Sequence, residues 1–103
     1  MARRRTPRFD HRDDLLDARV AVELDLHGRR AAEAGKLVES FITTQARVRS
    51  GQVVRIITGR GRNSSAGSVL RPAVREVLRR LSGSLVAEFD RDADEGSFLV
   101  RLR

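Results

Sequence analysis

The stretch from Val20 to Ile57 has the pattern of a β-α-β unit, and this pattern constrains the fold more than any other part of the sequence. A strand with one buried face is predicted by the alternation of Val20, Val22, Leu24 and Leu26. From about Arg30 to Arg49, apolar residues recur at steps of three and four, which predicts an amphipathic helix. The β-branched run Val53–Ile57 is typical of a strand buried on both faces. A right-handed crossover then makes the two strands parallel.

Three further elements complete the predicted fold. A second helical stripe consists of Leu70, Ala73, Val74, Val77, Leu78 and Leu81. Pro72 fits the first turn of this helix, where its missing N–H is not needed. Two strands follow, at Leu85–Phe89 and Phe98–Leu102, as a hairpin or as near neighbours. The sequence therefore predicts an α/β two-layer sandwich of order β-α-β-α-β-β, with two helices on a four-stranded mixed sheet. Residues 19–103 form this domain, and residues 1–18, rich in Arg and Asp, form a flexible arm.

Composition points to an anionic partner. The net charge is +7, from 21 Lys and Arg against 14 Asp and Glu, which favours nucleic acid above other partners. The aromatic residues are four Phe, mostly at apolar positions, so phosphate contacts and not base stacking are expected to supply the affinity. The chain has no cysteine, which excludes disulfides and thiolate metal sites, and we expect a cytoplasmic protein. No apolar run is long enough for a membrane span.

The segments that follow the two parallel strands are expected to meet at one edge of the sheet. Asp25 and His27 lie two residues apart at the end of the first strand, so their side chains share a face. A carboxylate beside an imidazole suits general acid–base chemistry, and a Gly-rich, Arg-containing turn suits phosphate binding. The sequence thus predicts a phosphodiester site with Asp25 and His27 as catalytic residues. The predicted phosphate- or nucleic-acid-binding residues are Gly28, Thr58, Gly59, Arg60, Gly61, Arg62 and Arg71.

Each part of this site also has a structural interpretation. Asp25 and His27 can form a hydrogen bond that only stabilises the turn. The glycines of a Gly-x-Gly loop can likewise serve only to let the chain turn. The repeat of Arg71, Arg75 and Arg79 at steps of four can be a solvated helix face. With two histidines and no cysteine, a structural zinc site is excluded. A catalytic Mg²⁺ or Mn²⁺, held by Asp25 and phosphate oxygens, stays open.

Three motifs resemble the Smr (small MutS-related) domain family. They are Leu24-Asp25-Leu26-His27-Gly28, Ile57-Thr58-Gly59-Arg60-Gly61 and Leu70-Arg71-Pro72-Ala73-Val74, within a resemblance that covers roughly residues 20–103. The resemblance implies the fold of the C-terminal domain of translation initiation factor three. It also implies endonuclease activity on DNA or RNA, including ribosome-linked cleavage of mRNA. The family's Asp and His correspond to Asp25 and His27, and its glycine loop to Gly59 and Gly61.

The sequence departs from this family at Thr58, where many members have a histidine. It is similar to a branch in which Thr-Gly-Arg-Gly precedes an Asn/Ser-rich stretch, here Asn63-Ser64-Ser65. Two functions are therefore predicted side by side: an endonuclease in which His27 is the imidazole that acts, and a non-catalytic nucleic-acid- or ribosome-binding module. A protein-interaction domain is a third reading. We expect a stand-alone monomer without membrane association.

Overall fold

The computed structural model describes residues 15–16, 18–59, 65–92 and 96–103, with side chains described from residue 69 onward in the segment that begins at 65. Its strands and helices are β1 (Val20–Asp25), α2 (Ala31–Val48), β2 (Val53–Ile57), α3 (Ser65–Leu81), β3 (Val86–Arg91) and β4 (Ser97–Leu102). The sheet order is β1-β2-β4-β3, with β1 parallel to β2 and the other neighbours antiparallel. This architecture confirms the predicted β-α-β-α-β-β order and the mixed four-stranded sheet.

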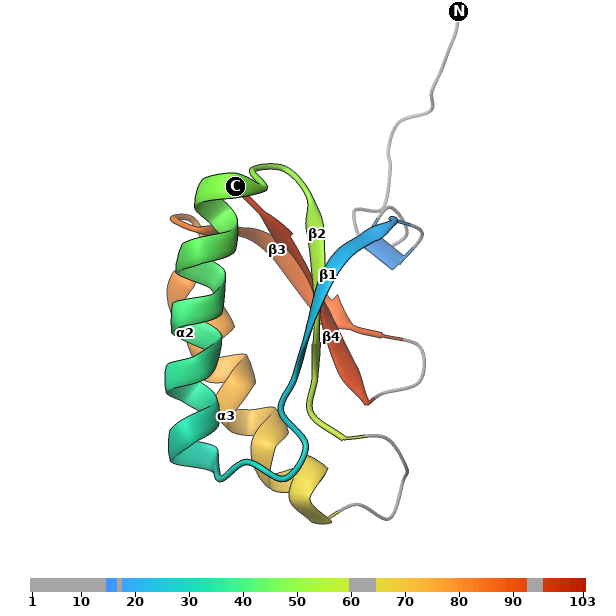
Figure 1. Ribbon diagram of the computed structural model, residues 1–103, viewed down its shortest axis with the longest axis vertical. Coiled ribbons are helices and arrows are strands. Elements are labelled where there is room, and N and C mark those ends of the chain that lie inside the picture. The colour runs from blue at the N-terminus through green and yellow to red at the C-terminus, as the bar shows by residue number, and fades with distance from the viewer. Residues whose placement is uncertain (1–14, 17, 60–64, 93–95) are drawn as a thin grey trace, which may run out of the picture.

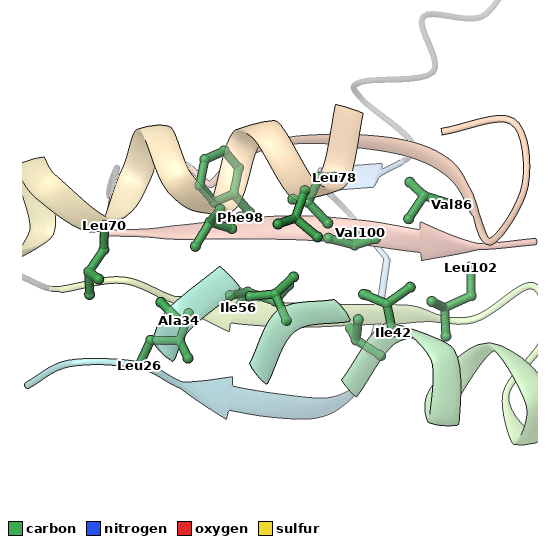
Figure 2. Close-up of a cluster of buried hydrophobic side chains, with 14 residues drawn as sticks. Leu26, Ala34, Ile42, Ile56, Leu70, Leu78, Val86, Phe98, Val100 and Leu102 are labelled. Atoms are coloured by element: carbon green, nitrogen blue, oxygen red, sulfur yellow. The ribbon is translucent and has the colours of Figure 1, made fainter. Parts of the chain in front are cut away.

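Both helices cover the same face of the sheet, and the main hydrophobic core fills the space between these two layers (Figure 1). The strands contribute one alternating set of side chains to this core, and each helix contributes one stripe, as period-two and 3.6-residue patterns require. Figure 2 shows the labelled core residues Leu26, Ala34, Ile42, Ile56, Leu70, Leu78, Val86, Phe98, Val100 and Leu102. Fully burying one such large side chain stabilises the fold by about 1.5–3 kcal/mol, so the core fixes the positions of the strand ends.

The opposite face of the sheet carries a smaller apolar cluster. Leu15 is 1% exposed and packs with Val53 and Leu99, whose chain neighbours Val54 and Phe98 face the helices. The short segment that contains Leu15 lies on the side of the sheet away from α2 and α3 (Figure 1). Residue 15, which the sequence places in the arm, is therefore anchored to the sheet. The domain boundary near residue 19 stays a prediction, since residues 1–14 and 17 lie outside the described part of the chain.

Helix α3 begins earlier than the sequence predicts. It starts at Ser65, so Pro72 lies inside the helix and not in its first turn. The apolar stripe that the sequence shows begins only at Leu70, and Val69 before it is exposed. A proline also disfavours helical geometry at the preceding residue, so both local signals favoured a start near Arg71. Helix α3 is therefore more than one turn longer at its beginning than the sequence predicts.

Three strands end, and β4 begins, at one edge of the sheet, here called the carboxyl edge. Asp25 pairs with Ile57, Ile57 with Ser97, and Arg91 with Phe98. The Leu26 N–H continues the ladder by donating to the Ile57 carbonyl at 2.7 Å. The expectation that the ends of the two parallel strands meet at one edge is thus confirmed. In the described part of the chain, neither helix combines the length and apolar character that crossing a bilayer requires.

Candidate functional site

Asp25 and His27 form a hydrogen-bonded pair directly after β1. His27 Nδ1 lies 2.9 Å from Asp25 Oδ1, and the His27 backbone N–H donates to the same oxygen at 3.0 Å. Because an ionised carboxylate only accepts hydrogen bonds, this geometry favours the neutral tautomer with the proton on Nδ1 and the lone pair on Nε2. The side chains of His27 and Asp25 are 75% and 52% exposed. The imidazole is therefore fixed at one nitrogen while its ring is open to a ligand that arrives from solvent.

The local chain conformation explains this arrangement. Leu26 is buried in the core, and its carbonyl accepts the Arg29 N–H at 3.0 Å, which closes a tight turn. Gly28 has φ 82°, a conformation that glycine adopts without strain. The carboxylate of Asp25 supports the same turn by accepting the N–H two residues later, as Asp side chains commonly do. The turn therefore holds His27 beyond the carboxyl edge of the sheet.

Thr58 is fully buried and ties the end of β2 to the residue before β4. Its N–H and its hydroxyl donate to the Gly96 carbonyl at 2.9 and 3.2 Å, and the Gly59 N–H donates to the same carbonyl at 3.2 Å. The Gly59 N–H was expected to be a phosphate donor, but it is already engaged with Gly96. The Thr58 hydroxyl is thus turned to the backbone and shielded from solvent.

The beginning of α2 carries its own acidic residue. Glu33 lies in the first turn, and its Oε1 accepts the Arg30 N–H at 3.2 Å. This carboxylate supplies negative charge where an anion would otherwise meet free N–H groups. The predicted phosphate-binding residues Arg60, Gly61 and Arg62 lie outside the described residues.

A basic groove lies on the helix side of the carboxyl edge. Arg71, Pro72, Arg75 and Arg91 line an open cavity of about 310 Å³, here called the arginine groove. Arg79, which the sequence groups with Arg71 and Arg75, instead forms an ion pair with Glu76 at 2.6 Å. Arg91 was missed because its acidic neighbours resemble a loop. Phe89 packs against the core, and the alternation of β3 then sends residue 91 to the same helix-covered face.

The arginine groove and the Asp25–His27 pair lie at opposite ends of the carboxyl edge. Asp25 ends β1 and Arg91 ends β3, and these are the two outer strands of the order β1-β2-β4-β3. Strands lie about 4.8 Å apart, so the ends of β1 and β3 are separated by about 14 Å. The structure therefore brings Arg71 together with Arg75 and Arg91, and not with the pair.

Other arginines of the sheet are engaged in ion pairs on the face away from the helices. Arg55 contacts Glu23 at 2.8 Å and Asp92 at 3.1 Å, and Arg101 contacts Glu88 at 3.0 Å. These pairs neutralise the centre of that face.

The described residues do not form a metal centre of their own. Within residues 15–16, 18–59, 65–92 and 96–103, no group of three or more His, Cys, Asp or Glu side chains could hold an ion. Asp25 Oδ1 already accepts two hydrogen bonds from His27. Mg²⁺ or Mn²⁺ at Asp25 would therefore take most of its ligands from substrate oxygens and water, as Mg²⁺ often does.

Comparison with known proteins identifies the family of this chain. The model of the Smr domain family matches residues 24–103, from the first residue of the Leu-Asp-Leu-His-Gly motif to the end of the chain. The chain belongs to the Smr domain family. Membership associates this Smr domain with nucleic-acid binding and nuclease function. An uncharacterised protein of Treponema pallidum (strain Nichols) is 36% identical over 105 residues, covering 97% of this chain and 52% of that protein. The chain thus spans about half the length of this relative.

Proposed function

We propose that this Smr domain is an endonuclease that cleaves a phosphodiester bond of DNA or RNA, with His27 as the general base and acid. The observation that carries the proposal is the double use of Asp25 Oδ1, which accepts both the backbone N–H and the ring Nδ1 of His27. This arrangement orients the imidazole and leaves the basic Nε2 accessible. Asp25 is then a positioning residue that acts through His27.

On RNA, His27 Nε2 takes the proton of the 2′-hydroxyl while the 2′-oxygen attacks the phosphorus. The bond between phosphorus and the 5′-oxygen breaks, and that oxygen receives a proton from water or from the same imidazole. The products are a 2′,3′-cyclic phosphate and a 5′-hydroxyl end. On DNA, which lacks the 2′-hydroxyl, the proton acceptor would activate a water molecule instead. Because Thr58 stands where many family members have a histidine, we propose His27 as the single imidazole for both proton transfers.

The anion contacts are part of the same proposal. Gly28 and Arg71, together with Arg60, Gly61 and Arg62 of the loop, would hold the phosphates of the substrate. Thr58 and Gly59 contribute by bracing the loop against Gly96, and phosphate would have to displace that carbonyl to reach their N–H groups. We further propose a monomer that works in the cytoplasm, in line with a cysteine-free chain whose partner is nucleic acid.

The test is a cleavage assay on structured RNA and on supercoiled plasmid DNA, with and without EDTA. His27→Ala should lower the cleavage rate by about 10²–10⁴-fold, the usual contribution of a positioned acid or base. Asp25→Ala should lower it less, and Asp25→Asn should restore part of it because its amide oxygen can still accept from Nδ1. Thr43→Ala, on the exposed face of α2, is the matched control. An undiminished rate in His27→Ala would refute the catalytic assignment.

A second candidate is a nucleic-acid- or ribosome-binding module without catalysis. The burial of Thr58 favours it, because the imidazole that many family members have at this position is missing and no solvent-accessible group replaces it. This candidate predicts binding that weakens steeply with salt, while RNA and DNA stay intact in Mg²⁺ and in Mn²⁺. End-group analysis separates the two, since a 2′,3′-cyclic phosphate arises only if the protein cleaves RNA.

A further inference from the structure

We infer that the arginine groove binds a non-reacting backbone phosphate of the nucleic acid, displaced along the strand from the phosphate that faces His27. The three guanidinium groups come from two elements, with Arg71 and Arg75 on α3 and Arg91 at the end of β3. Arg75 and Arg91 are exposed and Arg71 is half-buried, so a ligand can reach all three.

Three positive charges meet in the groove. Among the residues that the structure describes, no carboxylate forms an ion pair with Arg71, Arg75 or Arg91. The next two arginines of α3 differ in this respect, since Arg79 contacts Glu76 at 2.6 Å and Arg80 contacts Glu39 at 3.6 Å. Each guanidinium presents a rigid fork of N–H donors that matches the oxygens of a phosphate.

The shape and lining of the groove favour the sugar–phosphate backbone over a base. Its volume of about 310 Å³ lies at the lower end of the range of cavities that hold small ligands, so a phosphodiester unit fits. Among the described residues that line the groove, Pro72 is the single non-arginine, and none of these side chains carries an aromatic ring or an amide that could stack on or read a base. The groove therefore supplies affinity without sequence preference.

The position of the groove relative to His27 indicates which phosphate it would bind. This step rests on the proposed function, in which His27 faces the reacting phosphate. The ends of β1 and β3 are about 14 Å apart. One strand of B-form duplex advances 3.4 Å per phosphate along the axis, so about four phosphate steps span that distance. A strand laid along the carboxyl edge would contact the groove and His27 simultaneously. The groove would thus fix where the strand lies relative to the imidazole.

Binding can be measured without cleavage. In the His27→Ala background and in EDTA, a fluorescent 20-nucleotide RNA and a 20-base-pair DNA are titrated at several salt concentrations. Arg71→Gln, Arg75→Gln and Arg91→Gln should each weaken binding and reduce the salt slope of log K by about 1 on duplex DNA and about 0.7 on a single strand. Arg79→Gln and Arg80→Gln remove the same charge from ion-paired positions on the same helix, and they should change the slope less.

Two results would overturn the inference: groove variants that behave like the Arg79 and Arg80 controls, or a mononucleotide that binds as tightly as the oligonucleotide. The second would identify a site for small phosphorylated ligands. In cleavage by the otherwise unaltered protein, Arg71→Gln and Arg91→Gln should raise KM more than they lower kcat, because they remove phosphate contacts that the bound substrate and the transition state share. This outcome is separable from the proposed function, which fails if His27→Ala cleaves normally, whatever the groove does.

Discussion

Thr58 offers a direct test of how the carboxyl edge is built, through the change Thr58→His, which puts a bulkier side chain at a buried position. The site is fully buried, and the Thr58 hydroxyl donates to the Gly96 carbonyl at 3.2 Å. An imidazole there costs about 1–3 kcal/mol through overpacking, and the lost hydrogen bond costs about 0.5–1.5 kcal/mol. We therefore expect the free energy of unfolding to fall by about 2–4 kcal/mol, out of a total of about 5–15 kcal/mol for a domain.

Thr58→Val is the matched control for this change. It removes the hydroxyl but leaves the Thr58 and Gly59 N–H groups on the Gly96 carbonyl, so no acceptor is orphaned. We expect a loss of no more than about 1 kcal/mol. Urea unfolding followed by circular dichroism measures both variants, and cleavage assays run beside it. If Thr58→His is as stable as the wild type and cleaves faster, then the loop can open, and the view of Thr58 as a buried brace is wrong.

Three further changes test other parts of the structure. Gly28→Ala places an L-residue at φ 82° in open space, so thermal unfolding should show a loss of about 1–2 kcal/mol from backbone strain alone, and cleavage should fall if the turn positions His27. Gly35→Ala should raise the free energy of unfolding by about 1 kcal/mol, because a Cβ there meets Val77 Cγ2 at an ordinary 3.7 Å and alanine favours the helix; a loss of stability would contradict the observed packing of α2 on α3. Pro72→Ala returns a donor to the interior of α3 and should add about 1–3 kcal/mol, measured by urea unfolding, whereas no gain would mean that the helix begins after residue 72.

Periodicity and spacing predicted the parts of the fold that depend on local pattern. The alternation that ends at Leu26 and the stripe from Leu70 to Leu81 determine which faces are buried, and the structure buries those faces. The contact between Asp25 and His27 was also predictable, because residues i and i+2 of a strand share a face. What spacing could not show is that one carboxylate oxygen holds both the ring and the backbone of His27.

Features that depend on strand order could not be predicted from periodicity and spacing. Arg71 and Arg91 meet only because β3 lies at the outer end of the sheet and its last residue faces α3. Likewise, the contacts of Thr58 with Gly96 join residues 38 positions apart, and no local pattern encodes them. The start of α3 was misplaced for a different reason, since Pro72 gives a strong local signal for a first turn although the helix already begins at Ser65.

The two ends of the carboxyl edge differ in charge and in chemistry. Arg55 and Arg101, on the sheet face away from the helices, are engaged in ion pairs. Glu33 places a carboxylate at the beginning of α2. In the described part of the edge, the cavity lined by guanidinium groups lies beside β3, whereas the accessible imidazole lies beside β1. A polyanion bound in the groove therefore reaches His27 along this edge by crossing the beginning of β4 and the end of β2. An elongated substrate with several phosphates can contact the arginine groove and His27 at the same time, whereas a single phosphate group cannot.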